Sequence, residues 1–282
     1  MQICELAIYP IKACRSISLK TATVTPKGFL WDREFMITDR AGKFLTQRQY
    51  PQLALIEVQI EGEKITLSAA SYPTIEFTAT IIGEEISVEV WRDRLMAIDQ
   101  GDQVANWLQS VLKTPHPLRL VRQSPRYIRP INPNYATREN APVSFADGYP
   151  FLITNTASLA ELNRRLTAIY PDRSQNVPMN RFRPNIVIDS DRPFLEDEWQ
   201  VLQIGEVVFD LVKPCARCIV TTTDQISAQC NELREPLKTL GTFRHFGKEG
   251  IIFGQNAIPR QTGQIKIGDK VQNLAQNLTN SI

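Results

Sequence analysis

Histidine and glycine are both scarce in this sequence of 282 residues. The two histidines, His116 and His245, stand in no motif such as H-E-x-x-H. A Ser/His/Asp triad or a multi-histidine zinc site would need one or both of them, so hydrolase activity is disfavoured. The 13 glycines form neither a G-x-G-x-x-G nor a G-x-x-x-x-G-K-[ST] loop. The common nucleotide cofactors are therefore not expected.

The sequence also lacks an excess of one charge and a long apolar run. Lys and Arg number 32 against 30 Asp and Glu, a net charge of +2 that does not favour nucleic-acid binding. The apolar stretch 53–60 is interrupted by Glu57 and Gln59, well short of the ~20 residues of a membrane helix. No basic and apolar leader precedes the first strand-like pattern, so we expect neither a signal peptide nor a membrane segment. Any anion that binds should be small.

Cysteines and composition indicate the compartment and the class of chain. The five cysteines are Cys4, Cys14, Cys215, Cys218 and Cys230. Their odd number, in a chain long enough to bury a real core, favours a reducing compartment, and we expect the cytoplasm. Hydrophobic residues at 43% and charged residues at 22% are typical of globular proteins. The length predicts one large domain or two closely packed ones.

Residues 1–95 carry short β patterns separated by turns. Segments 35–38 and 43–46 flank a turn and predict a hairpin, and segments 53–60 and 64–68 predict a second one around Gly62. Further strands are predicted at 3–8, 19–24 and 85–91. We therefore predict a small antiparallel barrel or sandwich over residues 1–95.

The second half, residues 96–282, reads as α+β. Helical periodicity first occurs at 103–112, and a second helix at 156–169 has Asn155 or Thr156 as its cap and stops before Pro171. The polar tract 115–142 is long enough to be a functional loop. Strands are predicted at 185–188, 199–204, 206–212, 218–223, 251–253 and 264–271, with a short helical segment at 236–240. These strands predict a sheet that closes on itself.

The segment Cys215-Ala216-Arg217-Cys218 is the most conspicuous candidate for chemistry. It lacks the second cysteine pair of a zinc knuckle, and the strand predicted from Cys218 disfavours a thioredoxin-like pair, which would open a helix. Two buried core cysteines are the plain alternative. Arg217 argues against two buried core cysteines, because a guanidinium keeps its charge and is not expected beside an apolar sulfur unless an anion binds there. A thiolate next to a fixed cation suits a metal carried by an anionic, sulfur-rich cofactor.

Other cationic and polar residues are candidates for binding such a cofactor. Arg183 and Asn185 lie on the same side of an extended segment, because strand side chains repeat every second residue. Lys12 follows the turn at Pro10, and Arg33 precedes the first predicted hairpin. Arg48 and Arg181 are as readily explained as solvated surface charges.

At this point the sequence resembles the MOSC-domain proteins. The segments that carry the resemblance are Tyr9-Pro10-Ile11-Lys12, Asp32-Arg33, Thr46-Gln47-Arg48-Gln49, Phe182-Arg183-Pro184-Asn185-Ile186-Val187-Ile188, Cys215-Ala216-Arg217-Cys218 and 263–271. The resemblance implies a mainly β protein with an N-terminal MOSC β-barrel domain at 1–95 and a MOSC β-barrel domain with flanking helices at 96–282. The mitochondrial amidoxime-reducing component and its bacterial relatives have this organisation.

The resemblance also implies a mononuclear molybdenum enzyme. Cys218 would be the catalytic residue and the metal ligand, beside the pterin dithiolene of the molybdenum cofactor. The positions implied for binding the pterin and its phosphate are Lys12, Arg33, Gly148, Tyr149, Arg183, Asn185 and Arg217. The sequence departs from the family pattern at Ala13 and Ala216, where serine is common, and at Gly148-Tyr149, where small hydroxyl residues are frequent.

The resulting functional hypothesis is an oxidoreductase that reduces small N-hydroxylated compounds by oxo transfer. No cysteine follows Cys230, so an iron-sulfur domain is not expected and electrons should come from a separate ferredoxin- or cytochrome-type protein with its reductase. Two alternatives stay open. One is a sulfur carrier or transferase, and the other is a module that binds and delivers the cofactor without turnover.

Overall fold

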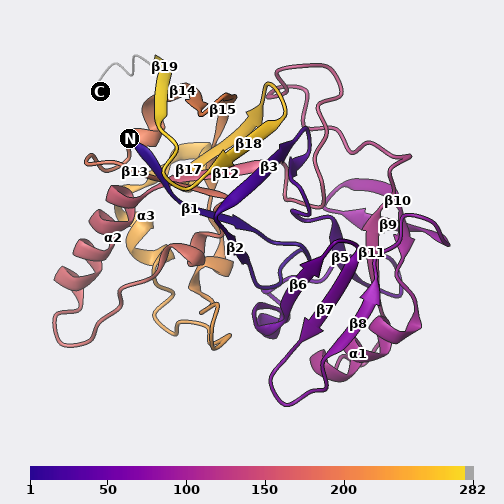
Figure 1. Cartoon of the computed structure of the whole chain (residues 1–282). Coiled ribbons are helices and arrows are strands. Elements are labelled where there is room, and N and C mark those ends of the chain that lie inside the picture. Colours follow the sequence, from indigo (N-terminus) through magenta and orange to yellow (C-terminus); the bar gives the residue numbers. More distant parts are fainter. Residues whose placement is uncertain (277–282) are drawn as a thin grey trace.

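The computed structural model describes residues 1–276, in which the largest sheet has nine strands (Figure 1). Its main path runs β19-β14-β15-β17-β12-β13-β1-β2, and β16 pairs with β17. The strands are β1 (Gln2–Ile8), β2 (Ile17–Leu19), β12 (Phe151–Asn155), β13 (Ile186–Asp189), β14 (Trp199–Ile204), β15 (Val207–Ala216), β16 (His245–Phe246), β17 (Gly250–Pro259) and β19 (Val271–Gln276).

The first strand of the chain belongs to this large sheet. Leu6 of β1 pairs with Ile186 of β13 on one side and with Leu19 of β2 on the other, both antiparallel. Figure 1 accordingly shows the indigo β1 beside elements of the second half. The N-terminal residues thus complete a sheet that is built mainly from residues beyond 150.

Three smaller sheets contain the remaining strands. Their orders are β5-β11-β10-β9, β6-β7-β8 and β18-β3-β4. Their strands are β3 (Thr21–Thr25), β4 (Gly28–Phe29), β5 (Phe35–Asp39), β6 (Glu57–Glu61), β7 (Lys64–Ser68), β8 (Ile75–Thr78), β9 (Glu85–Val90), β10 (Asp93–Asp99), β11 (Leu118–Gln123) and β18 (Gly263–Lys266). The boundary predicted between residues 95 and 96 falls inside β10, and the sheet containing this strand continues to Gln123.

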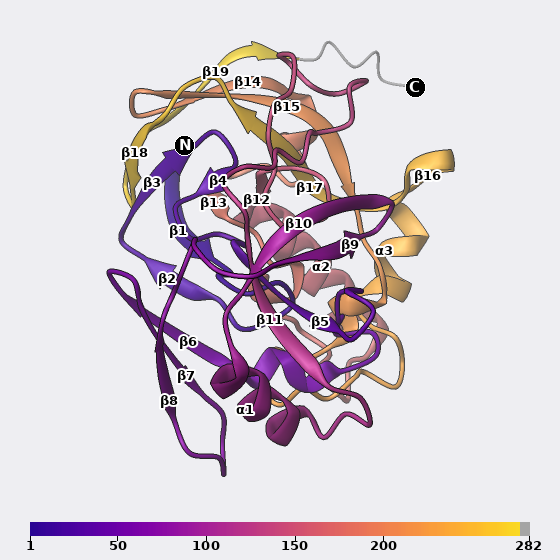
Figure 2. The ribbon, with the colours of Figure 1, turned by 90° about the vertical axis from the view of Figure 1, so that its right-hand side faces the viewer.

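The helices lie against the sheets whose strands they contact. Helix α1 (Asp102–Leu112) contacts β11, α2 (Thr156–Ile169) contacts β13, and α3 (Leu237–Phe243) contacts β17 (Figure 2). The Asn155 side chain caps α2 as predicted, accepting a hydrogen bond from the Ala157 amide at 2.9 Å. No helix of residues 1–276 is long and apolar enough to cross a membrane. The short 3₁₀ helices are η1 (Pro51–Leu55), η2 (Met179–Phe182), η3 (Leu195–Glu198), η4 (Ile219–Thr222) and η5 (Gly247–Glu249).

The strand predicted at 218–223 is wrong. Strand β15 continues to Ala216, and η4 follows Cys218. The hydroxyls of Thr221 and Thr222 donate to the carbonyls three residues before them, at 2.9 and 2.7 Å, and these bonds support a tight turn rather than a strand. The objection to a thiol-disulfide pair that rested on this strand loses its support.

Several other segments differ from the prediction. Segment 53–60 begins as η1 and only then becomes β6, segment 19–24 is divided between β2 and β3, and segment 43–46 forms isolated bridges instead of a strand. The strand expected at 264–271 is two strands, β18 and β19, separated by a turn in which Gly268 has φ +88°. The tract 115–142, expected to be a loop, contains β11. The predicted class is nevertheless confirmed, because the chain is mainly β, helices flank the large sheet, and its second half combines strands with α2 and α3.

Aromatic packing and a close backbone contact at one glycine hold the central strands of the large sheet together. The Phe151 ring packs edge-on against Phe29 and Phe209, with centroids 4.8 and 5.2 Å apart. Gly254 of β17 has φ +80°, and a Cβ there would lie 2.8 Å from the Ile153 carbonyl of β12. Only glycine fits this contact, which aligns β12 and β17 beside the site described below.

Candidate functional site

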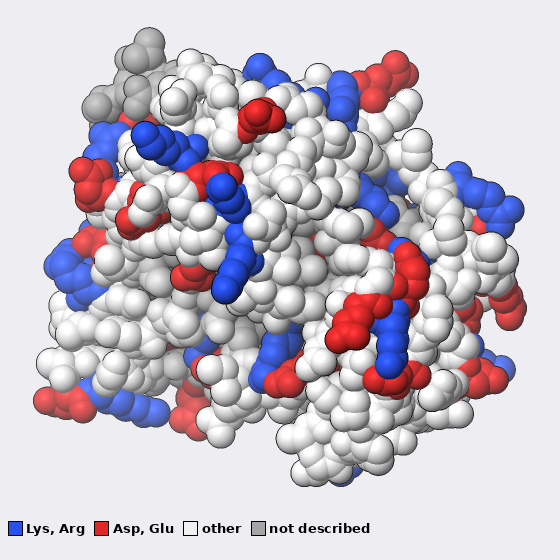
Figure 3. All heavy atoms as spheres, in the orientation of Figure 1, with Lys and Arg blue, Asp and Glu red and all other residues white. Residues whose placement is uncertain are grey.

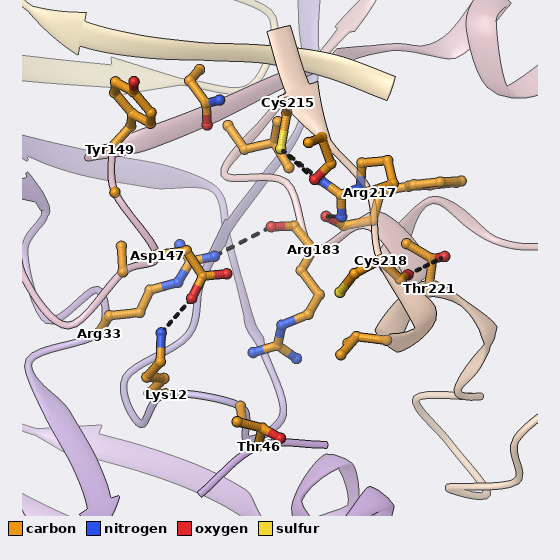
Figure 4. A pocket seen from close by; sticks show the side chains of 18 of the residues that line it. Lys12, Arg33, Thr46, Asp147, Tyr149, Arg183, Cys215, Arg217, Cys218 and Thr221 are labelled. Carbon is orange, nitrogen blue, oxygen red and sulfur yellow. Dashed lines mark hydrogen bonds and ion pairs between the residues drawn. The ribbon is translucent and has the colours of Figure 1, made fainter. Parts of the chain in front are cut away.

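A cavity of about 360 Å³ opens between the N-terminal sheets and the end of β15 (Figure 4). Most of its wall comes from five segments: 12–13, 44–48, 146–149, 182–185 and 213–218. All eight residues that the sequence singled out line it, namely Lys12, Arg33, Gly148, Tyr149, Arg183, Asn185, Arg217 and Cys218. The fold thus brings these residues together, while their individual roles stay predictions.

The cavity is strongly biased toward positive charge. One carboxylate, Asp147, lines it together with six cationic side chains: Lys12, Arg33, Arg48, Arg183, Lys213 and Arg217. Over the outer face shown in Figure 3, Lys and Arg are instead interspersed with Asp and Glu. The residues that line the cavity therefore carry a net positive charge, which is suited to an anion.

Lys12 is fixed from two directions. Its Nζ donates to the Phe145 carbonyl at 2.9 Å and to Asp147 Oδ1 at 2.5 Å (Figure 4). Burial lowers the pKa of Lys12, and Asp147 opposes that shift. The Asp147 side chain is exposed, and the nearby Lys12 ammonium holds its pKa below its ordinary range. The pair holds the cation at a defined point of the wall.

Arg33 and Asn185 form a second polar unit. Arg33 Nη1 donates to Asp32 Oδ2 at 2.5 Å and to Asn185 Oδ1 at 3.0 Å. Asn185 also donates from Nδ2 to the Ala7 carbonyl and accepts from the Leu152 amide. The amide thereby ties β1 and β12 to the guanidinium.

Arg183 is half-buried and has no carboxylate among its hydrogen-bond partners. Its Nη1 donates to Gln225 Oε1 at 3.0 Å and its Nη2 to the Cys14 carbonyl at 2.8 Å, both neutral acceptors. Burial lowers the pKa of Arg183 to about 10. A cation held only by neutral groups is costly to bury, and a bound anion would remove that cost.

Tyr9 is a part of the site whose role sequence reasoning missed. The guanidinium carbons of Arg33 and Arg183 each lie 4.2 Å from its ring centroid, a cation–π distance. The Tyr9 hydroxyl donates to the Pro184 carbonyl at 3.0 Å, and burial raises its pKa to about 12. The ring is therefore a fixed, neutral platform for two guanidinium groups.

The two cysteines of the C-x-R-C segment differ in their contacts and exposure. Arg217 Nη1 donates to Cys215 Sγ at 2.9 Å, and its Nη2 donates to the Phe182 carbonyl at 2.6 Å. Arg217 Nε is buried and has no partner among the described residues. Cys215 is half-buried and engaged by Arg217, so its sulfur is not open to a ligand in the way that Cys218 is.

Cys218 is the open thiol of the cavity. Its side chain is exposed, and Figure 4 shows the sulfur pointing toward Arg183 in the middle of the cavity. Its carbonyl accepts the bond from Thr221 that shapes η4. Within residues 1–276 no group of three His, Cys, Asp or Glu side chains could share a metal ion. A metal at Cys218 would thus take most of its donors from outside the protein, as a dithiolene cofactor provides.

The departures from the family pattern also line the cavity. Ala13 has φ 69°, and its carbonyl accepts from Gln47 Nε2 at 2.7 Å. Ala216 is exposed, and a Cβ added to Gly148 would meet nothing within 4 Å. The wall therefore has space at Gly148 and no hydroxyl at these three positions. Tyr149 is half-buried, and burial raises its pKa.

Arg181 and Arg48, for which the sequence analysis left a surface role open, have different surroundings. Arg181 is buried outside the cavity wall, where Nη1 donates to the Thr222 carbonyl and Nη2 pairs with Asp224, both at 2.9 Å. Arg48 is exposed and lines the cavity. Asp147 and Trp91 are hydrogen-bonded to each other there, and the sequence analysis assigned neither of them to the site.

Comparison with known proteins decides the family. The MOSC N-terminal beta barrel domain matches residues 1–115, and the MOSC domain matches residues 140–272. The chain is 34% identical over 294 residues to mitochondrial amidoxime-reducing component 1 of Homo sapiens, an alignment that covers 97% of this chain and 83% of that protein. This chain belongs to the MOSC-domain family. The resemblance stated from its motifs is confirmed.

Relatives within the MOSC-domain family have two kinds of name. Mitochondrial amidoxime reducing component 2 of Bos taurus is 32% identical, over 97% of this chain and 83% of its own length. Molybdenum cofactor sulfurase of Danio rerio is 29% identical, over 85% of this chain but 30% of its own length. The family is thus associated with the molybdenum cofactor.

Proposed function

We propose that this MOSC-domain protein is a molybdenum-cofactor-dependent reductase of N-hydroxylated compounds. The observation that carries the proposal is an open thiol, Cys218, facing a cavity whose guanidinium groups at Arg183 and Arg217 have no carboxylate. A soft donor beside uncompensated cations suits a metal held by an anionic sulfur ligand. The alignment with amidoxime-reducing components over nearly the whole chain supports the same reaction class.

The residues of the cavity fit the cofactor in complementary ways. Cys218 would ligate the metal, and the bound cofactor would supply two-electron oxo transfer. Lys12 offers a point charge suited to a phosphate, while Arg33 and Arg183 offer planar donor forks suited to phosphate or pterin edges. The unpartnered Nε of Arg217 is a further donor for a buried acceptor.

The protein's own contribution is positioning. Tyr9 keeps its proton at neutral pH and holds two guanidinium groups at fixed positions. Asn185 links one of these groups to the backbone of two strands. Because these contacts lie within the protein, the fold itself holds the binding groups in position.

The electrons are proposed to come from a separate protein of ferredoxin or cytochrome type, with its own reductase. The substrate is proposed to be a small N-oxygenated molecule, and the cytoplasm is proposed as the location.

Two alternatives use the same cavity. The alignment covers 83% of an amidoxime-reducing component but 30% of a cofactor sulfurase, which favours reduction over sulfur transfer. A delivery module would bind the cofactor without turnover.

The test begins with metal and pterin content. Protein purified from a host that makes the cofactor should contain molybdenum and pterin in nearly equal amounts, and a reduced dye should drive reduction of an amidoxime under anaerobic conditions. Cys218→Ser should lose the bound metal, and Cys230→Ser is its matched control, because Cys230 is an exposed cysteine outside the cavity. Absence of both metal and pterin would contradict the proposal. Full loading without turnover for any donor would favour the delivery module.

A further inference from the structure

Arg48 differs from the other five cations of the cavity. Lys12 and Arg33 pair with carboxylates, Lys213 lies 3.7 Å from Glu249, and the remaining two arginines donate to neutral acceptors. The Arg48 side chain has no hydrogen bond or ion pair among residues 1–276. It instead makes a cation–π contact with the Trp91 ring, whose centroid lies 4.8 Å from the guanidinium carbon.

Trp91 is a rigid support for this guanidinium. Its Nε1 donates to Asp147 Oδ1 at 3.1 Å, and its ring packs against Phe44 with centroids 5.0 Å apart. Both Asp147 and Phe44 line the cavity. The indole is therefore held at its polar edge and on its apolar side, although 42% of the residue is exposed. A guanidinium stacked on an aromatic ring keeps its in-plane N–H groups free for a carboxylate.

The position of Arg48 also separates it from the groups proposed to hold the cofactor. Lys12 is 8% exposed and Arg183 is enclosed by Tyr9 and Gln225, whereas Arg48 is exposed at the rim. Thr46, in the same segment as Arg48, lies on the side of the cavity away from Tyr149 (Figure 4). Arg48 is therefore accessible to a ligand that enters the cavity from solvent.

We propose that Arg48, supported by Trp91, binds a carboxylate group of the substrate and gives the site a preference for anionic N-hydroxylated compounds. The inference rests on the proposed function for its substrate class. A planar carboxylate can accept two parallel N–H bonds from a guanidinium, which a neutral substrate cannot do. The segment that carries Arg48 thus sets specificity, and the segment around Cys218 carries the chemistry.

The experiment compares two probes of the same size class, benzamidoxime and 4-carboxybenzamidoxime. Binding to molybdenum-loaded protein is measured by calorimetry, and KM and kcat are measured with a reduced dye. The variants are Arg48→Gln, which removes the charge, and Arg48→Lys, which keeps the charge but removes the fork. Arg40→Gln is the matched control, because Arg40 is an exposed arginine of the same half that does not line the cavity.

In Arg48→Gln the ratio of the two dissociation constants, carboxylated over neutral, should rise about 5- to 10-fold at low salt. Arg48→Lys should show a smaller rise and Arg40→Gln none. The preference of the unsubstituted protein should weaken as ionic strength rises. Unchanged ratios in Arg48→Gln would overturn the inference. Loss of molybdenum and pterin in that variant would overturn it too, because Arg48 would then hold the cofactor's phosphate.

The binding arm also separates the two proposals. Arg48-dependent binding of the carboxylated probe, without reduction of either probe by fully loaded protein, would contradict the proposed reductase and leave the anion subsite standing. Reduction of both probes, with a ratio that does not depend on Arg48, would support the reductase and refute the subsite.

Discussion

Replacing Arg183 by glutamine should weaken cofactor binding far more than it destabilises the fold. Burial lowers the pKa of Arg183 from 12.5 to about 10, a shift that corresponds to about 3 kcal/mol. Between these pH values the unfolded chain binds more protons than the folded one, so this cost is present in full below pH 10 and is lost as pH rises toward 12.5. At pH 7 the substitution removes the cost together with two hydrogen bonds to neutral acceptors, each worth about 1 kcal/mol.

These opposing terms leave the free energy of unfolding of the cofactor-free protein within about 2 kcal/mol of its original value. Loss of a charge-assisted contact with an anion should cost about 1.5–3 kcal/mol, or roughly 10- to 150-fold in cofactor affinity. The assay is urea unfolding of protein from a host without the cofactor, beside molybdenum and pterin content of protein from a host that makes it.

Arg181→Gln is the matched control, since Arg181 is a buried arginine that pairs with Asp224 outside the cavity wall. Breaking a buried ion pair leaves an uncompensated charge, so this variant should lose about 2–4 kcal/mol of stability. Its cofactor content should fall less than that of Arg183→Gln. If Arg183→Gln unfolded readily while retaining the cofactor, Arg183 would be a structural residue and the reasoning would fail.

Three further predictions follow from the same structure. Cys218→Ser should abolish bound molybdenum and turnover while circular dichroism shows a retained fold, and Cys215→Ser should be much milder; equal metal loss in both would indicate a paired-cysteine site instead. Gly254→Ala should lower the free energy of unfolding by about 2–4 kcal/mol, because its Cβ would meet the Ile153 carbonyl at 2.8 Å, and an unchanged urea midpoint would refute this packing argument. NAD(P)H alone should give no turnover, whereas a ferredoxin- or cytochrome-type donor with its reductase should, at a rate that falls with added salt; reduction by NADPH without any other protein would contradict the proposed separate donor.

Local signals account for the parts of the fold that the sequence predicted well. Helix α2 has its cap at Asn155 and its stop near Pro171 within the same short stretch, so no distant contact is needed to place it. At Ile219–Val220 the local signal led to a wrong prediction. β-branched residues favour a strand, but the side-chain bonds of Thr221 and Thr222 turn the backbone into η4.

The cations of the site could be found because they stand in recognisable motifs, but their supports could not. Tyr9 reaches the Pro184 carbonyl across 175 positions, and Trp91 reaches Asp147 across 56. Nothing in the local pattern at either end announces such a contact. The same holds for the lack of a carboxylate at Arg183, which depends on everything packed around it.

The placement of β1 in the large sheet determines when that sheet can be completed. One antiparallel neighbour, β2, follows within 20 residues, but the other, β13, ends at Asp189. A ribosome adding 5–20 residues per second needs roughly 10–40 s to pass from β1 to the end of β13. During this interval one edge of β1 lacks its partner strand, and a chaperone that covers unpaired strands would act on β1 until β13 emerges.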